Sequence, residues 1–188
     1  VVYADAITTE SDTYAEEIKM PFYGEGLDGL MRARANSLRG IVNGIDYDEF
    51  NPETDEFIVQ KYNAKNFRKE KAKNKVALQE ELGLIKDPGK FMIGIVSRLT
   101  DQKGLDLIQC VMDEICSDDL QFVVLGTGDE RYENMFRHYD WKYNERVSAN
   151  IYYSNPMSHK IYAACDAYLM PSLFEPCGLS QLIALRYG

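Results

Sequence analysis

The stretch "FMIGIVSRLTDQKGLDLIQCVMDEICSDDLQFVVLG", residues 91–126, decides the fold. It begins and ends with short apolar runs, 91–97 and 120–126, which are rich in β-branched residues. Such runs are typical of strands that are buried on both faces of a sheet. The intervening segment 105–116 has one apolar helical face, made of Leu105, Ile108, Val111, Met112 and Ile115. A strand, a helix and a strand joined by short links predict a βαβ crossover with two parallel strands.

The same alternation extends in both directions along the chain. We predict strands at 1–9, 38–46, 147–153 and 166–171, and helices at 67–84, 130–143, 156–165 and from Gly178 onward. The many Lys and Glu residues of 67–84 indicate a solvated helix face. The predicted fold class is therefore α/β, with a Rossmann-like parallel sheet flanked by helices. Ligands of such sheets bind at the carboxyl ends of the strands, which selects the loops 97–104, 126–130, 153–156 and 171–178.

The composition and the net charge of the chain argue against several classes of binding partner. The 188 residues are 45% apolar and 27% charged, which is typical of an ordinary globular protein of one or two domains. A net charge of −9 argues against nucleic acid or an anionic membrane surface as the main partner, and no apolar run approaches the roughly 20 residues of a membrane span. The four cysteines form no CxxC pair and no zinc spacing, so we expect reduced thiols, a cytoplasmic location and no bound metal. His138 and His159 lie outside any catalytic motif, and we expect structural or exposed roles for them.

The loop after the first of these strands, "SRLTDQKG", carries two cations, Arg98 and Lys103. At the carboxyl end of a parallel strand and beside a helix N-terminus, an arginine and a lysine suit a phosphate or diphosphate. The alternative is a pair of exposed surface cations, with Asp101 as an ion-pair partner for either.

The next two loops, 126–130 and 153–156, give weaker indications of a ligand site than the loop with Arg98 and Lys103. The sequence "GTGDER" lacks the third glycine of a dinucleotide fingerprint because Arg131 stands there, which favours a tight turn over a phosphate cradle. Tyr152 and Tyr153 close the predicted strand 147–153, so one of them should face the core and the other outward. An outward tyrosine could stack on a nucleobase, but this loop taken alone favours packing as the role of both rings.

The last loop, "PSLFEPCGLSQL" at 171–182, precedes a helix start near Gly178. The first backbone N–H groups of that helix, around Leu179 and Ser180, favour an anion. Glu175 would repel such an anion, so it suits the neutral hydroxyls of a sugar, unless it is simply a helix cap in water. Cys177 has the character of a small buried residue, with nothing that makes it a nucleophile.

Taken together, "SRLTDQKGLDL", "VVLGTGD" and "MPSLFEPCGLSQLIALRYG" resemble the ADP-glucose-dependent bacterial glycogen synthases and plant starch synthases. These enzymes form family 5 of the retaining glycosyltransferases, with the GT-B fold. The segments "TTESDTYAEEI", "YGEGLDGLMRAR" and "GIVNGIDYDEFNPETD" extend the resemblance along the whole chain. It implies transfer of glucose from ADP-glucose to the non-reducing end of an α-1,4-glucan, with no cofactor or metal.

The resemblance also implies a domain arrangement and site residues. Residues 1–40 are expected to form the end of the N-terminal domain, and 41–188 the first half of the C-terminal, nucleotide-sugar-binding domain. By motif position, Arg98 and Lys103 would hold the donor diphosphate, and Glu175 the transferred glucose. The sugar and phosphate pocket would be lined by Cys177, Gly178, Leu179 and Ser180, with Tyr153 against the adenine.

Some positions depart from the wider pattern. Ile183 replaces a second glutamate common among other GT-B transferases, which favours the glycogen and starch synthase branch. Tyr152 and Leu173 stand where the family commonly has glycine and arginine. A lysine-glycine-glycine loop and a Thr-Gly-Gly loop are absent, so we expect a fragment that is inactive alone and self-associates through its open sheet edge. The alternatives are another GT-B transferase with a different nucleotide sugar, or a non-catalytic nucleotide-sugar-binding module.

Overall fold

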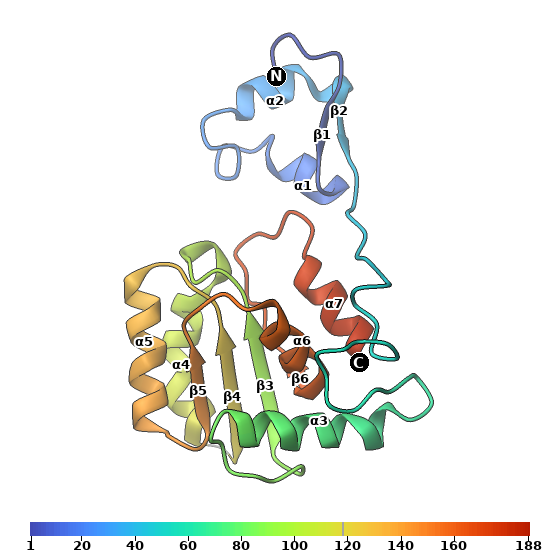
Figure 1. Ribbon diagram of the computed structural model, residues 1–188. Helices are drawn as coiled ribbons and strands as arrows, with labels where there is room; N and C mark the ends of the chain where they lie inside the picture. Colours follow the sequence, from blue (N-terminus) through green and yellow to red (C-terminus); the bar gives the residue numbers. More distant parts are fainter. Residues whose placement is uncertain (118) are drawn as a thin grey trace. The chain divides into compact units, whose positions relative to one another are not determined.

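The computed structural model describes residues 1–117 and 119–188, and it divides into two compact units (Figure 1). The first unit consists of Val1–Ile45 and Phe174–Leu179, and the second of Asp46–Leu173 and Ser180–Gly188. The expected domain assignment, with 1–40 as the end of an N-terminal domain and 41–188 as half of a C-terminal one, stays a prediction.

In the first unit, β1 (Ile7–Thr9) pairs in parallel with β2 (Leu38–Gly40). The accompanying helices are α1 (Asp12–Glu17), α2 (Asp28–Ala33) and the 3₁₀ turn η1 (Ala35–Ser37). Ser11 caps α1, because its Oγ accepts a hydrogen bond from the Tyr14 backbone N–H at 3.0 Å. The strand predicted at 1–9 begins only at Ile7, and the strand predicted at 38–46 ends at Gly40.

The second unit is built on a parallel sheet with the strand order β5-β4-β3-β6. The strands are β3 (Phe91–Val96), β4 (Leu120–Leu125), β5 (Val147–Asn150) and β6 (Ala167–Tyr168). The helices are α3 (Phe67–Glu81), η2 (Asp101–Lys103), α4 (Leu105–Ser117), α5 (Glu130–Lys142), α6 (Asn155–Ala164) and α7 (Leu179–Tyr187), of which α7 begins in the first unit at Leu179. Because the connection after β5 returns past β4 and β3, the order reverses between β3 and β6, and this is where ligands of such sheets bind.

Side chains along β4 explain why its sequence is continuously apolar. Phe122 and Val124 pack into a core with α4 and α5, whereas Val123 and Leu125 pack with α3 and α6. All four side chains are at most 3% exposed. Helices therefore cover both faces of the sheet, as predicted for a parallel α/β architecture (Figure 1).

Two strands of this sheet are also shorter than predicted, and the buried face of α4 differs from the predicted one. β5 stops at Asn150 and β6 pairs with β3 only through Ala167 and Tyr168. On α4, Val111 is 40% exposed, and the core instead receives Cys116, which is one turn beyond Met112. A cysteine behaves here as a small apolar residue.

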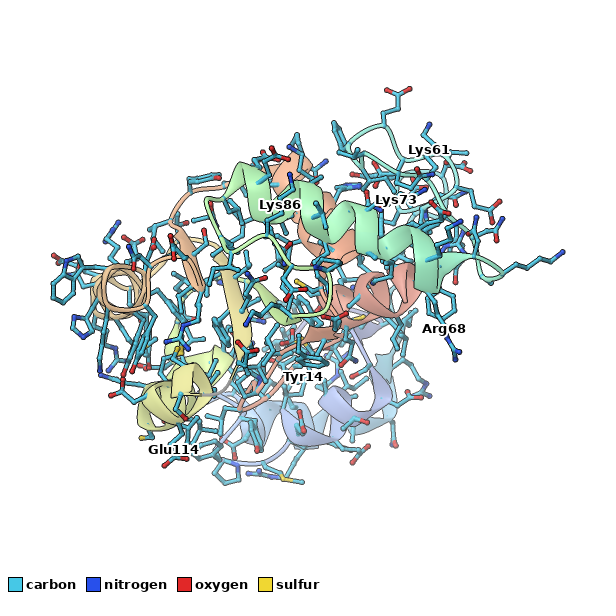
Figure 2. The ribbon with its side chains drawn as sticks, turned by 90° about the horizontal axis from the view of Figure 1, so that it is seen from below. Tyr14, Lys61, Arg68, Lys73, Lys86 and Glu114 are labelled. Carbon is cyan, nitrogen blue, oxygen red and sulfur yellow. The ribbon has the colours of Figure 1, made fainter. Side chains whose placement is uncertain are left out.

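The prediction of a solvated face for α3 is only partly correct. Arg68 and Lys73 lie on its exposed side (Figure 2), but Lys75 is 5% exposed. Its Nζ donates to Asp166 Oδ2 at 2.6 Å and to the backbone carbonyl of Lys90 at 2.9 Å. Burial of a lysine with a carboxylate partner and carbonyl acceptors is permitted, and the charge pattern alone does not reveal it. Among the described residues, no helix is long and apolar enough to cross a membrane.

Candidate functional site

The loops that follow β3 and β4 are locked together by main-chain contacts. The Leu99 N–H donates to the Thr127 carbonyl at 2.9 Å, and the Asp129 N–H donates to the Leu99 carbonyl at 2.8 Å. A Cβ on Gly126 would lie 1.8 Å from the carbonyl oxygen of Ser97. The first glycine of "GTG" therefore serves close packing of two backbones, which fits the predicted tight turn.

The segment after β6 joins the same assembly. The Leu173 N–H donates to the Gln102 carbonyl at 2.9 Å. Gly104 ends η2 at φ +65°, and a Cβ there would lie 2.0 Å from the carbonyl oxygen of Pro171. The loop after β3 is thus held between the loop after β4 and the segment after β6, at the reversal of the strand order.

A cavity of about 250 Å³ lies at these strand ends. Its walls come from the ends of β3 and β4, from the loops after β3, β4 and β5, and from the first turn of α6. The lining residues are Val96, Ser97, Arg98, Leu125, Gly126, Thr127, Tyr152, Tyr153, Ser154, Asn155 and Ser158. Three of the four loops selected from the sequence therefore meet around one cavity, and two predicted site residues, Arg98 and Tyr153, line it.

The two predicted cations occupy different positions on the loop after β3. Arg98 is exposed, and its Nη2 lies 3.4 Å from Gln102 Oε1. Lys103 is half-buried at the end of η2 and does not line the cavity. Asp101, considered above as their ion-pair partner, forms an ion pair with Arg131 and accepts a hydrogen bond from the Tyr132 hydroxyl at 2.5 Å.

Tyr152 and Tyr153 do not alternate between core and surface, because β5 ends before them. Tyr152 is 43% exposed, and its hydroxyl donates to Asn150 Oδ1 at 3.1 Å. Tyr153 is 89% exposed at the rim of the cavity. The expectation that one ring enters the core is therefore wrong, whereas the expectation of an outward tyrosine at this loop is correct.

The other predicted residues are divided between the units. Glu175, Cys177, Gly178 and Leu179 belong to the first unit, and Ser180 belongs to the second. Gly178 has φ +81°, a conformation that favours glycine, and α7 begins at the next residue. Cys177 Sγ lies 3.8 Å from the Asn43 carbonyl oxygen, and Ser180 forms a hydrogen bond with the Tyr162 hydroxyl.

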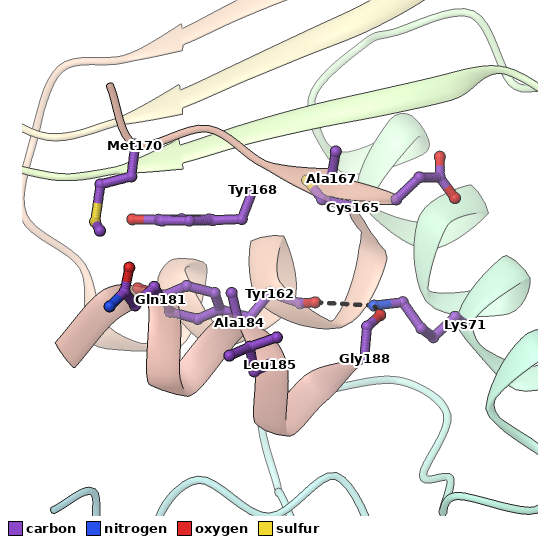
Figure 3. A pocket seen from close by; sticks show the side chains of 11 residues that line it. Lys71, Tyr162, Cys165, Ala167, Tyr168, Met170, Gln181, Ala184, Leu185 and Gly188 are labelled. Atoms are coloured by element: carbon purple, nitrogen blue, oxygen red, sulfur yellow. Dashed lines mark hydrogen bonds between the residues drawn. The ribbon is translucent and has the colours of Figure 1, made fainter. Parts of the chain in front are cut away.

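A second and larger cavity, of about 490 Å³, lies beside β6 and α7 and contains none of the predicted site residues (Figure 3). Lys71 lines it, and its Nζ donates to the carbonyl oxygens of Tyr162 at 3.3 Å and Tyr187 at 3.2 Å. Burial lowers the pKa of Lys71 to about 8. The lysine thus satisfies carbonyls near the C-termini of two helices, which is a structural duty.

Sequence reasoning also missed a buried polar cluster. His159 is 0% exposed, and its Nδ1 lies 2.8 Å from Asp55 Oδ2 and 3.1 Å from the Tyr187 hydroxyl. Burial raises the pKa of the Asp55 carboxyl, but hydrogen bonds from His159 and Tyr187 outweigh it and hold that pKa below its usual range. No local motif reveals partners that are 104 positions apart. Within 1–117 and 119–188, no group of three His, Cys, Asp or Glu residues could hold a metal ion.

Family models and curated relatives both relate the chain to glycosyltransferases of the glycogen and starch synthase type. Residues 80–188 match the family described as "Glycosyl transferases group 1", and residues 1–33 match "Starch synthase catalytic domain". The whole chain is 79% identical to a glycogen synthase of Lachnospira eligens and 73% identical to one of Lachnoclostridium phytofermentans. The chain covers 39% of each of these two relatives.

A solved structure of the catalytic domain of starch synthase IV from Arabidopsis thaliana, bound to ADP and acarbose, superimposes with a TM-score of 0.91 at 37% identity. The match covers 99% of this chain and 38% of that one. The resemblance to glycogen and starch synthases and the α/β, Rossmann-like fold class predicted from the sequence are both confirmed.

Proposed function

Because the chain belongs to the glycosyl transferases group 1 family, we propose that its protein transfers glucose from ADP-glucose to the non-reducing end of an α-1,4-glucan, with retention of configuration. The 79% identity to a glycogen synthase supports this activity. The chain spans about two fifths of the length of its curated relatives, 39%, so the proposal concerns a protein of their full length. For the 188 residues alone we expect no transfer.

The observation that carries the proposal is the cavity at the carboxyl ends of β3, β4 and β5, with Arg98 and Tyr153 in its lining. At about 250 Å³ it is smaller than the ~300–1,000 Å³ of typical ligand pockets, so it suits one part of a donor and not the whole molecule. We assign it to the adenine end, with Tyr153 available for stacking. Arg98 then directs its charge toward the diphosphate.

Positive charge is needed because the leaving ADP gains negative charge as the glycosidic bond breaks. Arg98 and Lys103 would stabilise that charge, together with the N-terminal N–H groups of α7 around Leu179 and Ser180. Glu175 would orient the glucose through hydrogen bonds to its hydroxyls, without a covalent role, and Cys177 and Gly178 would line the sugar pocket. The chain's net charge of −9 makes such a local positive site necessary for an anionic donor. No metal or cofactor is part of this proposal.

The experiment supplies a protein of the relatives' full length with ADP-glucose or UDP-glucose and measures glucose transfer to an oligoglucan. Faster transfer from ADP-glucose supports the proposal. Preference for UDP-glucose would instead identify a transferase with another donor, and binding of ADP-glucose without transfer would identify a binding module.

A cytoplasmic location of the protein and self-association of the 188-residue chain remain expectations. A strictly monomeric species in light scattering would contradict the expected self-association.

A further inference from the structure

Three polar side chains meet in the interior of the second unit, away from the cavity lining. Asp55 Oδ2 lies 2.8 Å from His159 Nδ1 and 2.5 Å from the Tyr187 hydroxyl. The Asp55 and His159 side chains are each 1% exposed. The second oxygen of Asp55, Oδ1, accepts a hydrogen bond from the Phe57 backbone N–H at 2.8 Å. The carboxylate therefore has three donors, which is what a buried ionised aspartate requires.

Each member of the cluster belongs to a different segment. Asp55 lies on the connecting segment 46–66 ahead of α3, His159 lies on α6, and Tyr187 is the last residue of α7. The His159 ring is enclosed by Phe50, stacked at a centroid distance of 5.0 Å, and by the edge of Phe57, also at 5.0 Å. The polar cluster is thus the point at which two helices and a connecting segment are joined.

Apolar packing alone could hold these segments together. Replacing a buried ion pair by well-packed apolar side chains is often neutral or stabilising, so the cluster is weak evidence for a role in stability. His159 Nε2, moreover, is buried without a hydrogen-bond partner. Hydrogen bonds are more directional than apolar contacts, because they restrict the distance and the angle between the groups that they join to narrow ranges.

The helix that carries His159 also forms one wall of the cavity. Ser154, Asn155 and Ser158 line the cavity at the first turn of α6, and His159 is the next residue. Met157, Ile161 and Ala164 of α6 are among the side chains that pack against the sheet, and apolar contacts of this kind are less directional than hydrogen bonds. His159 is one turn from Asn155, so a rotation of α6 that moved one would move the other.

We propose that Asp55, His159 and Tyr187 are positioning residues for the nucleotide cavity. They fix α6 about its axis and hold Ser154, Asn155 and Ser158 in place. The identity of the ligand rests on the proposed function, whereas the positioning of α6 does not.

The test compares two Tyr→Phe variants in a protein of the relatives' full length. Y187F removes the hydroxyl that donates to Asp55. The matched control is Y62F, because Tyr62 is also buried, at 3% exposure, and its hydroxyl donates at 2.8 Å to the Tyr187 carbonyl instead of to the cluster. We expect Y187F to raise KM for ADP-glucose on the order of tenfold with kcat nearly unchanged, since α6 lines the part of the cavity assigned to the adenine and carries none of the residues assigned to the leaving diphosphate. Y62F should leave KM unchanged.

Two substitutions of His159 differ in whether they can keep the hydrogen bond to Asp55. The amide nitrogen of asparagine can take the place of His159 Nδ1, whereas that of glutamine reaches toward Nε2. We therefore expect H159N to keep KM within a few-fold of the parent and H159Q to raise it on the order of tenfold, as Y187F does. Equal KM values in Y187F, H159Q and the parent would overturn the inference.

Hydrogen exchange in the 188-residue chain separates this inference from the proposed function. The Ser158 N–H donates to the Ser154 carbonyl at 3.1 Å and reports on the first turn of α6. We expect its exchange to accelerate on the order of tenfold in Y187F and to stay unchanged in Y62F. The same exchange rate in both variants would refute the positioning of α6, even if ADP-glucose proves to be the donor. Faster exchange in Y187F alone would uphold it, even if the donor proves to be another nucleotide sugar.

Discussion

Replacing Gly104 with alanine tests whether the loop after β3 is held by direct backbone contact with the segment after β6. Gly104 has φ +65°, and its missing Cβ would lie 2.0 Å from the Pro171 carbonyl oxygen. Gly83, which follows α3, has a nearly identical φ of +69° but nothing within 4 Å of the position that a Cβ would take. The pair therefore separates the effect of backbone conformation from the effect of the close contact.

The magnitude follows from these two geometries. A left-handed conformation costs an alanine about 1–2 kcal/mol, and this applies to both G83A and G104A. A carbon and a carbonyl oxygen approach to about 3.3 Å, and a Cβ on Gly104 would lie 2.0 Å from the Pro171 carbonyl oxygen, so the two backbones must separate by about 1.3 Å. Overpacking of this kind costs about 1–3 kcal/mol. The free energy of unfolding should therefore fall by about 2–5 kcal/mol in G104A and by about 1–2 kcal/mol in G83A.

The two variants and the parent are unfolded in urea, and circular dichroism monitors the transition. The midpoints are compared under a common value of m, the slope of the unfolding free energy against urea concentration. A larger loss in G104A than in G83A supports the contact. Equal losses would refute the reasoning, since the carbonyl of Pro171 would then yield without a free-energy cost. In a protein of the relatives' full length, G104A should also slow transfer, because Lys103 is the adjacent residue.

Two further predictions concern lysines. Burial lowers the pKa of Lys71 from 10.5 to about 8, so between these pH values the unfolded chain binds more protons than the folded one and stability rises with pH. The stability of the parent relative to K71M should accordingly increase from pH 8 to 10 in urea denaturation, and a constant difference would contradict this. For Lys103 we expect K103A to lower kcat about 10²–10³-fold in a full-length protein, as loss of a group that stabilises the leaving diphosphate does. Turnover near that of the parent would remove Lys103 from the site.

Local sequence predicts the elements whose character is set by their own residues. The runs 91–97 and 120–126 are apolar on both faces because helices cover both faces of the sheet, and they form β3 and β4 within one residue of the prediction. The loops selected from them surround the cavity because parallel strands bring their carboxyl ends to one edge.

Features that depend on distant partners could not be predicted. The end of β5 at Asn150 depends on how far β4 extends beside it, and the burial of Lys75 depends on Asp166, 91 positions away. Sequence spacing also gave no indication that Phe174–Leu179 groups with Val1–Ile45. The role of Gly104 is visible only when Pro171 is placed against it.

The main-chain locking of the loops at Gly126 and Leu99 has a consequence for redesign. The positions of these loops are set by backbone carbonyl and N–H groups and by the absence of a Cβ at Gly126, whereas the inner surface of the cavity includes Ser97 and Thr127. Substituting these two side chains changes the cavity's shape and hydrogen-bonding pattern without removing the contacts that hold the loops. The shape of the cavity can therefore be altered one side chain at a time while the backbone contacts between the loops are kept.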